Sequence, residues 1–279
     1  MKVRVLTALG IVTVGLPLLI FSQYIVYPIA LGMLAAMAVF EVLRVLSVHK
    51  IYILSVPAIL VSAVMPVLTY DSIFGIDERS YILLLALVLF AFLFYTVLLT
   101  VFSKGRINVG SAASVFMLLT YITAAFSSMG LLRYMENGAY VFGLVFVGAW
   151  VCDTFAYFTG VLFGKHKLIP ELSPKKTVEG SLGGIAFTVI AFVLYGLIVE
   201  KTSSLSANYL VLALSGLILS VVAQLGDLFA SLIKREHGIK DYSRLLPGHG
   251  GIMDRFDSIL AVSAVLMIIC QLFPPFSAV

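Results

Sequence analysis

The residues best suited to chemistry in this sequence are four aspartates inside or at the ends of apolar segments. They are Asp153, Asp227, Asp254 and Asp257. A carboxylate in apolar surroundings costs free energy unless something compensates it, so it often marks a functional site. Asp227 and Ser231 share a helical face with the basic pair that follows, which suggests a metal below and phosphates above. For Asp153, a buried pair with a basic side chain is the alternative.

Basic residues surround these aspartates in the sequence. The candidates for binding phosphate are Lys175, Lys176, Lys234, Arg235, Lys240 and Arg255. The stretch Ser-Pro-Lys-Lys-Thr, which ends at Thr177, closes a loop and opens a predicted helix. Free N–H groups and the positive dipole at a helix start suit phosphate. Any single lysine could instead be an anchor at the membrane surface.

A glycine-rich segment, residues 247–251 (Pro-Gly-His-Gly-Gly), precedes the last apolar stretch. Its glycines allow close approach of backbone to a ligand. Asp254, Asp257 and Ser258 then share one face of the predicted helix. His249 is either a turn residue or a phosphate or acid–base contact. Carboxylates together with phosphate oxygens usually hold Mg²⁺, so the pattern indicates metal-assisted transfer at phosphorus at a membrane surface.

Several other classes of site do not fit the sequence. Gly164-Lys165-His166 lacks the spacing and the hydroxyl residue of a P-loop. The sequence has no His/Cys cluster for zinc and no Gly-x-Ser-x-Gly motif for acyl transfer. Cys152 and Cys270 both fall in apolar segments and are interpreted as small buried hydrophobes. The net charge of +4 does not indicate nucleic-acid binding.

Composition predicts an all-α, polytopic membrane protein. The chain is 61% hydrophobic and 11% charged, with a mean hydropathy of +1.11. Apolar segments long enough to span a bilayer recur throughout. The nine predicted spans are about 5–22, 24–48, 51–70, 80–102, 110–132, 139–162, 181–199, 207–233 and 252–273. The first span resembles a signal peptide, but no small-residue cleavage site follows it, so we expect it to be retained.

The distribution of Lys and Arg predicts the orientation. With the N-terminus in the cytoplasm, 15 of the 18 basic residues fall on the cytoplasmic side. The chemistry-bearing segments then also face the cytoplasm. We predict an N-terminal part, residues 1–138, for packing, assembly and a lipid-side cavity, and a C-terminal catalytic part, residues 139–279. In the N-terminal part, Glu41 and Arg44 are interpreted as a surface ion pair or snorkelling side chains.

The C-terminal residues resemble the phosphatidate cytidylyltransferases, also called CDP-diacylglycerol synthases. The resemblance covers residues 139–279 by motif and the rest by hydrophobic pattern. An upstream part runs from Asp153 through Ser173-Pro174-Lys175-Lys176-Thr177 to Gly184. The main motif comprises Ser231, Ile233, Lys234, Arg235, Lys240, Asp241, Ser243, Leu246, Pro247, His249, Gly250, Gly251, Ile252, Asp254, Arg255, Phe256 and Asp257.

The resemblance implies the reaction CTP + phosphatidate → CDP-diacylglycerol + pyrophosphate, in a polytopic inner-membrane protein that can dimerise. It also implies Mg²⁺, with a second cation that could be monovalent, such as K⁺. We expect Asp227, Asp254 and Asp257 to bind metal. Catalytic roles are expected for these three and for His249, Lys234 and Arg235. Substrate binding is expected for Asp153, Lys175, Lys176, Thr177, Ser231, Lys240, Asp241, Gly250, Gly251, Arg255 and Ser258.

Two rival functions are considered. A CTP-dependent lipid kinase of the dolichol kinase type would share the nucleotide and the membrane but transfer the γ-phosphoryl group. A transporter would also contain intramembrane aspartates and helices broken by glycine. Against a transporter, the carboxylates cluster at the predicted cytoplasmic ends of the last spans. A transporter would place them at the midplane between two repeated halves.

Overall fold

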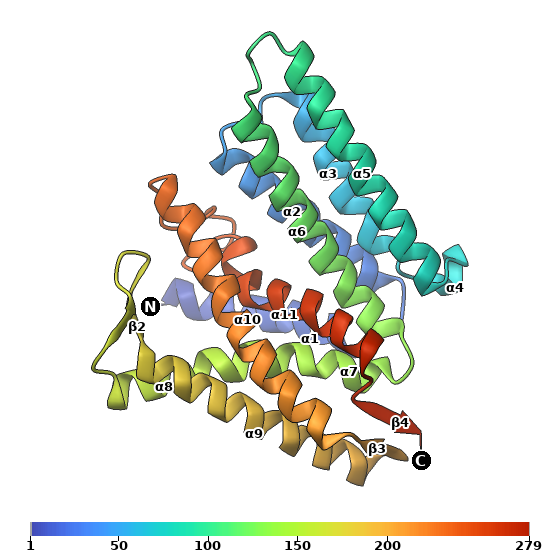
Figure 1. The fold of residues 1–279 in the computed structure, drawn as a ribbon, viewed down its shortest axis with the longest axis vertical. Coiled ribbons are helices and arrows are strands. Elements are labelled where there is room, and N and C mark those ends of the chain that lie inside the picture. The colour runs from blue at the N-terminus through green and yellow to red at the C-terminus, as the bar shows by residue number, and fades with distance from the viewer. Residues whose placement is uncertain (1, 279) are drawn as a thin grey trace. The chain divides into compact units, whose positions relative to one another are not determined.

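The computed structural model describes residues 2–278, and nearly all of their regular structure is helical (Figure 1). The long helices are α1 (Lys2–Ile20), α2 (Val26–Val45), α3 (Tyr52–Val67), α5 (Glu78–Phe102), α6 (Val109–Tyr134), α9 (Val178–Thr202), α10 (Tyr209–Glu236) and α11 (Met253–Leu272). The shorter ones are α4 (Asp71–Phe74), α7 (Gly138–Phe146), the π-helix η1 (Val147–Val151) and α8 (Cys152–Phe163). Four short strands are β1 (Lys167–Ile169), β2 (Ser173–Thr177), β3 (Leu205–Ala207) and β4 (Phe276–Ala278).

Seven helical segments among the described residues are long and apolar enough to cross a membrane. They are α2, α5, α6, the continuous stretch α7–η1–α8, α9, α10 and α11, and they coincide with seven of the nine predicted spans. The other two predicted spans correspond to α1 and to α3, which is apolar but has only 16 residues. The predicted class, an all-α membrane protein, is confirmed, whereas the count of nine spans is not.

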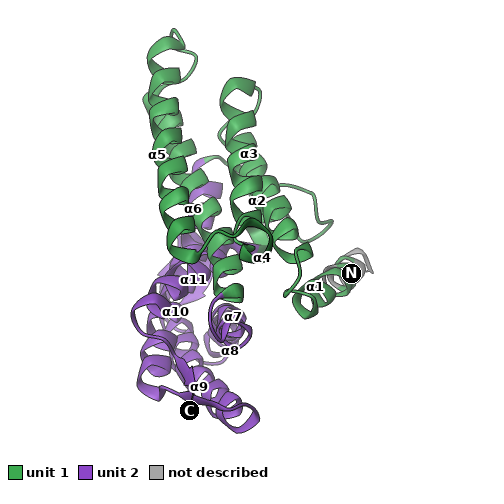
Figure 2. Ribbon diagram, turned by 90° about the vertical axis from the view of Figure 1, so that its right-hand side faces the viewer, with its two compact units in different colours: residues 1–134, 237–255 green, residues 135–236, 256–279 purple. Residues whose placement is uncertain are grey.

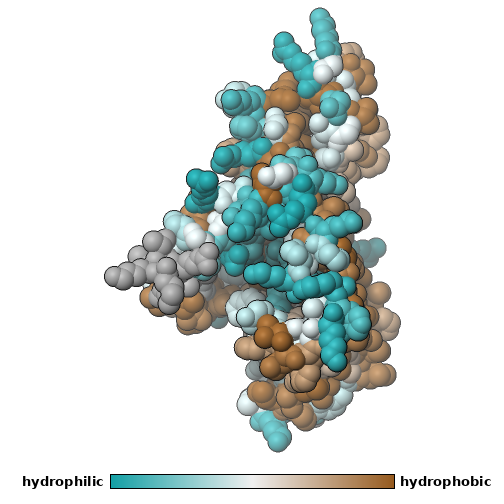
Figure 3. Space-filling view, turned by 90° about the vertical axis from the view of Figure 1, so that its left-hand side faces the viewer, coloured by the Kyte–Doolittle hydropathy of each residue, from teal (hydrophilic) through white to brown (hydrophobic). Residues whose placement is uncertain are grey.

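Apolar side chains cover much of the surface, as expected for helices that face lipid. Only 11% of the most apolar window of α5 is buried, and residues such as Leu87 and Phe102 are exposed. A helix that is apolar all round and yet exposed is typical of a membrane span. Figure 3 shows one face of the molecule. Hydrophobic residues, in brown, cover much of this face, and hydrophilic residues, in teal, gather in one part of it.

The chain divides into two compact units (Figure 2). The first contains the residues up to Tyr134 together with the segment His237–Arg255. The second contains Met135–Glu236 and the residues from Phe256 onward. The segment that carries the glycine-rich motif therefore groups with the N-terminal helices, although it follows them by more than 100 residues in the sequence. The predicted division of roles at residue 138 stays a prediction.

In the first unit, α2, α3 and α6 pack against one another. Leu31, Leu54, Ile122 and Phe126 are among the side chains that are fully buried in these three helices. Burial of an aliphatic or aromatic side chain of this size favours packing through dispersion contacts with many neighbours. The segment His237–Arg255 is joined to this bundle by hydrogen bonds to Glu41 of α2.

In the second unit, α9 packs along α8 and α10. Small residues allow α8 and α9 to approach closely. A Cβ at Gly180 would lie 2.6 Å from the carbonyl oxygen of Ala156, and one at Gly184 would lie 3.0 Å from that of Cys152. Such contacts are typical of helices that associate within membranes. Two antiparallel strand pairs complete the unit: β1 and β2 form a hairpin, and β3 pairs with β4 near the end of the described chain.

Candidate active site

Three of the predicted aspartates come together in the second unit. Asp153 stands on α8, Asp227 on α10 and Asp257 on α11. Each interacts electrostatically with the others, so their like charges repel. The hydroxyl of Ser258 donates a hydrogen bond of 3.2 Å to Oδ2 of Asp153. We call Asp153, Asp227 and Asp257 the carboxylate cluster. Three acidic groups gathered within apolar helices indicate a site for a cation.

Lys176 provides positive charge at this cluster. Its Nζ forms an ion pair with Oδ2 of Asp227, and about a quarter of each side chain remains exposed. Lys176 lies on β2, where successive side chains point to opposite faces. Its neighbour Lys175 is accordingly exposed. Lys176 is thus ion-paired with one of the three acidic groups of the cluster. Asp153 therefore does have a basic group nearby, Lys176, in addition to Ser258.

The helices α10 and α11 cross closely beside the cluster. A Cβ at Gly226 would lie 2.7 Å from both the Cβ of Ala261 and the carbonyl oxygen of Asp257. Gly226 directly precedes Asp227 in α10. The absence of a side chain at this position therefore allows the backbones that carry Asp227 and Asp257 to approach each other.

A π-helix ends two residues before Asp153. The five residues Val147–Val151 adopt this conformation between α7 and α8. A π turn shifts the register of the helix that follows it, and such turns frequently occur at functional sites. Asp153 is exposed. The exposed part of this carboxylate lies in a membrane-spanning segment, where lipid cannot solvate it, so a polar partner beside Ser258 is favoured there.

The C-terminal end of α10 adds further cations. Lys234 and Arg235 lie in its last turn, and Ser231 lies one turn before them. Lys234 is half-buried and acts electrostatically on Asp257, whereas Arg235 is exposed. Cations at a helix C-terminus are also favoured by the helix dipole. The predicted helical face of Asp227, Ser231 and the basic pair is thus present in a continuous helix.

The donor chemistry of the carboxylate cluster fits Mg²⁺, although not as a cage made by protein alone. Among residues 2–278, no group of three or more His, Cys, Asp or Glu side chains is arranged so that it could hold a metal ion. Mg²⁺ commonly takes only one or two carboxylates and completes its shell with water and substrate phosphates. Asp227 and Asp257 can supply two hard oxygen ligands of this kind.

The loop between α10 and α11 forms a cavity in the first unit. Its volume is about 440 Å³. The lining includes three cationic side chains and one acidic side chain. The residues that line it are Lys240, Asp241, Ser243, Arg244, Leu246, Pro247, Gly248, His249, Gly250 and Arg255. A small, open cavity with an excess of positive charge suits an anionic group such as a phosphate.

A tight turn presents His249 in this cavity. The N–H of Leu246 donates to the carbonyl oxygen of Gly250 at 2.9 Å, and the N–H of His249 donates to that of Leu246 at 2.8 Å. Gly248 and Gly250 have φ angles of +77° and +85°, which only glycine adopts readily. The Nδ1 atom of His249 is buried without a hydrogen-bond partner among the described residues. The histidine is thus a turn residue that also retains capacity for a polar contact.

Asp254 organises this loop. Its Oδ2 atom accepts hydrogen bonds from the N–H groups of Tyr242 at 2.8 Å and Gly251 at 2.9 Å. The residue is only 8% exposed. Its carboxylate therefore ties both ends of the loop to the first turn of α11. Asp257, one turn later on the same helix, belongs to the carboxylate cluster.

The interpretation of Glu41 as a surface residue is wrong. Glu41 is 3% exposed and lies on the buried face of α2, near the C-terminal end of that helix. Its Oε1 atom accepts hydrogen bonds from Ser243 Oγ at 2.6 Å and Ile252 N at 3.0 Å, and its Oε2 atom accepts one from Met253 N at 3.0 Å. Sequence reasoning treated intramembrane aspartates as functional signals but explained this glutamate by its nearness to a helix end. The free-energy cost of placing a carboxylate in an apolar segment applies equally to Glu41 and was the available signal.

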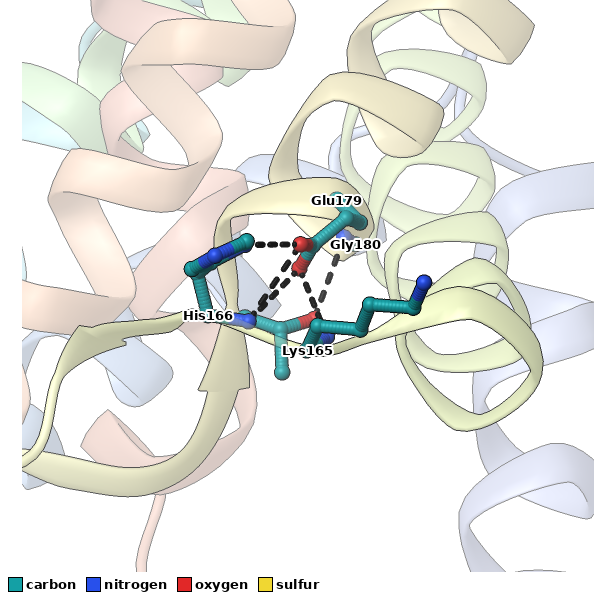
Figure 4. A network of polar contacts seen from close by, with 5 residues as sticks. Lys165, His166, Glu179 and Gly180 are labelled. Carbon is teal, nitrogen blue, oxygen red and sulfur yellow. Dashed lines mark hydrogen bonds and ion pairs between the residues drawn. The ribbon is translucent and has the colours of Figure 1, made fainter.

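The structure gives Thr177 and Glu179 a local role at the start of α9. Thr177 is the N-cap, and its Oγ1 accepts a hydrogen bond of 3.1 Å from Gly180 N. The Glu179 carboxylate accepts hydrogen bonds from Lys165 N at 3.1 Å and His166 N at 3.2 Å, and it contacts His166 Nδ1 at 2.6 Å (Figure 4). These contacts fix the loop after α8 against the first turn of α9. Sequence reasoning did not assign Glu179.

Most of the predicted site residues thus form two groups, which do not include Lys175, Thr177, Ser231 and Arg235. One is the carboxylate cluster of the second unit with the polar residues near it: Asp153, Lys176, Asp227, Lys234, Asp257 and Ser258. The other is the loop of the first unit: Lys240, Asp241, His249, Gly250, Gly251, Asp254 and Arg255. Arg244 lines the loop cavity as well and was not predicted; its place in the same basic loop was the available signal.

Comparisons with known proteins identify the family of this chain. The model of the cytidylyltransferase family matches residues 2–273. The phosphatidate cytidylyltransferase of Staphylococcus haemolyticus is 36% identical over 269 residues, which cover 96% of this chain and 98% of that protein. The phosphatidate cytidylyltransferase of Bacillus subtilis is 34% identical over 281 residues, 98% of each chain. With a family match over almost its whole length and relatives at this identity, the chain belongs to the cytidylyltransferase family, among the phosphatidate cytidylyltransferases.

Proposed function

We propose that this chain makes CDP-diacylglycerol and pyrophosphate from CTP and phosphatidate, in phospholipid biosynthesis. The observation that carries the proposal is the carboxylate cluster with Lys176, which three apolar helices and a hairpin assemble in the second unit. A structural role alone does not require three mutually repelling carboxylates inside apolar helices. Handling of a polyphosphate with a cation does require such charges.

The main requirement of the reaction is neutralisation of the negative charge on the two substrates. A phosphate oxygen of phosphatidate attacks the α-phosphorus of CTP, a new P–O bond forms, and the bond to the β-phosphate breaks to release pyrophosphate. Both reactants are anions, so positive groups must offset their repulsion. Lys176 and Lys234, which lie near the carboxylate cluster, are our candidates for this role. A phosphate monoester is already nucleophilic, so the residues need not supply a strong base.

We assign Asp227 and Asp257 as ligands of a Mg²⁺ ion, and Asp254 as a further candidate. Bound there, Mg²⁺ would supply electrostatic stabilisation of negative charge on phosphate oxygens. Asp153 and Ser258, which are hydrogen-bonded to each other, would provide polar groups near the Mg²⁺ ion. A second, monovalent cation such as K⁺ is part of the same proposal. Replacing K⁺ by a large organic cation in the assay buffer, at constant Mg²⁺, tests this second ion.

The cavity in the loop of the first unit is proposed to bind phosphate groups of the substrates. Lys240, Arg244 and Arg255 provide the positive charge, and His249 provides a polar contact. Arg side chains are well suited to phosphate because they donate two parallel hydrogen bonds.

We propose that the protein resides in the cell inner membrane, with the N-terminus and the site in the cytoplasm. The support is the excess of Lys and Arg on one side of the predicted topology. A homodimer is the proposed assembly. Cysteine labelling of inverted vesicles, at Lys104 for the cytoplasmic side and Arg79 for the opposite side, tests the orientation. Sedimentation in detergent tests the dimer.

The function is tested with purified protein in detergent, phosphatidate, Mg²⁺ and CTP labelled at the α-phosphate. We expect label in the lipid and release of pyrophosphate, both abolished by a chelator and restored by Mg²⁺. Transfer of label only from γ-labelled CTP would instead identify a lipid kinase. Uptake into proteoliposomes without chemical change of the substrate would identify a transporter.

A further inference from the structure

We infer that Glu41 is a positioning residue for this reaction, acting as a clamp that holds the glycine-rich loop and the start of α11. The inference rests on the proposed function, since the loop supplies the phosphate-binding cavity. Glu41 stands on α2, far from the loop in sequence, and contributes no group to the cavity lining itself. Its effect on the reaction must therefore pass through the loop residues that it holds.

The contacts of Glu41 reach both ends of the cavity loop. At one end, Ser243 donates to Oε1 at 2.6 Å. At the other, Ile252 N and Met253 N donate to the two carboxylate oxygens, each at 3.0 Å. Each oxygen therefore receives at least one donor. A buried carboxylate that accepts several hydrogen bonds is stabilised, whereas removal of the carboxylate leaves those donors unsatisfied.

The site of attachment is the N-terminus of a helix that also carries Asp254 and Asp257. The first N–H groups of a helix lack partners within it, and a carboxylate there is favoured by the helix dipole. Glu41 satisfies N–H groups at the very start of α11. Asp254 holds the neighbouring Gly251 N from within the helix. Two carboxylates from different helices thus fix three successive backbone N–H groups.

Gly251 makes this arrangement possible. A Cβ on Gly251 would lie 2.4 Å from Oε1 and 2.5 Å from Oε2 of Glu41. The carboxylate therefore packs directly against the glycine backbone, with no room for a side chain. This contact supplies a second reason, independent of ligand approach, for glycine in the motif. It also makes the loop conformation depend on a residue outside the motif.

The inference is tested with Glu41→Gln and with Ser243→Ala. An amide retains the size of the carboxylate but replaces one acceptor by a donor, which would face an N–H group. We expect kcat/KM for CTP to fall by about 100-fold in Glu41→Gln, since small misplacements of reacting groups cost this much. Ser243→Ala removes one of the hydrogen bonds and should lower kcat/KM about fivefold. Hydrogen exchange at residues 251–253 should accelerate in Glu41→Gln.

The matched control is Leu31→Ala, which removes a buried side chain from the same helix, ten residues before Glu41 in the sequence. We expect it to lower thermal stability while kcat/KM per folded enzyme stays within twofold of wild type. Equal losses of activity in Leu31→Ala and Glu41→Gln would overturn the inference, because α2 would then act through stability alone. Near wild-type kcat/KM in Glu41→Gln would also overturn it.

If Glu41→Gln fails to fold, the activity of Ser243→Ala tests the role of Glu41 instead. An unchanged kcat/KM in Ser243→Ala would contradict that role. Failure of the proposed function looks different. Wild-type protein that transfers label without divalent metal would refute the metal assignment, while the ratio of variant to wild-type activity would still measure the clamp. If the wild type gave no labelled lipid, exchange at residues 251–253 would still decide whether Glu41 holds the loop.

Discussion

The crossing of α10 and α11 at Gly226 allows a quantitative test of the carboxylate cluster. In Gly226→Ala, the new Cβ would start 2.7 Å from the Ala261 Cβ and the Asp257 carbonyl oxygen. Ordinary contacts begin near 3.4 Å, so the helices must separate by about 0.7 Å. The separation moves the backbone of Asp257 away from that of Asp227. A displacement of about 1 Å can cost 100-fold in rate, and we expect a loss of turnover of this order.

Overpacking of this kind also costs about 1–3 kcal/mol of stability, so the assay must separate the two effects. We would measure transfer of α-labelled phosphate from CTP into lipid per folded enzyme, alongside thermal unfolding. Gly15→Ala is the control, because a Cβ at Gly15 in α1 meets nothing within 4 Å. The double variant Gly226→Ala/Ala261→Gly removes one of the two clashes and should recover part of the rate. Full activity of Gly226→Ala would refute the idea that this crossing positions the reacting groups.

Three further predictions address individual side chains. Asp227→Asn should lower turnover by at least about 100-fold and raise the Mg²⁺ concentration needed for half-maximal rate. Lys201→Gln is the control, and an unchanged Mg²⁺ dependence in Asp227→Asn would contradict the assignment of Asp227 as a metal ligand. Arg244→Gln should raise KM for CTP about tenfold, as expected when a charge-assisted contact is lost; initial rates at varied CTP measure this, and an unaltered KM would remove Arg244 from the phosphate site. Thr177→Ala should lower the unfolding free energy by about 1 kcal/mol through loss of the α9 cap, and Thr177→Ser should restore it; unfolding curves decide.

The fold class could be predicted from the sequence because a membrane span can be recognised from the composition of its own residues. Seven predicted spans match helices within a few residues. The limits lie in features that depend on neighbours in space. The π-helix at Val147–Val151 has no signature in its own residues. The short helix α3 is as apolar as a span but contains only 16 residues, with Pro57 and Pro66 within it.

The site could be predicted in part for the same reason. Scarce charges in apolar segments drew attention to Asp153, Asp227 and Asp257, and the structure brings these three together. The partner of Asp227 could not be predicted, because several nearby lysines were equivalent in sequence. In the structure Lys176 pairs with it, whereas Lys175 is exposed. Glu41 was misread because its partners lie more than 200 residues away in the chain.

That separation has a consequence for the synthesis of the protein. Glu41 precedes Ser243, Ile252 and Met253 by 202, 211 and 212 residues. At about 5–20 residues per second, roughly 10–40 s pass between translation of the glutamate and of its donors. Burial of a carboxylate without hydrogen bonds costs free energy. The end of α2 that carries Glu41 must therefore stay in water during that interval. The first unit therefore completes its packing only after residues 252 and 253 have been made. Release of the nascent protein before residue 253 would leave a helix bundle with an exposed acidic end, which quality-control proteases could recognise.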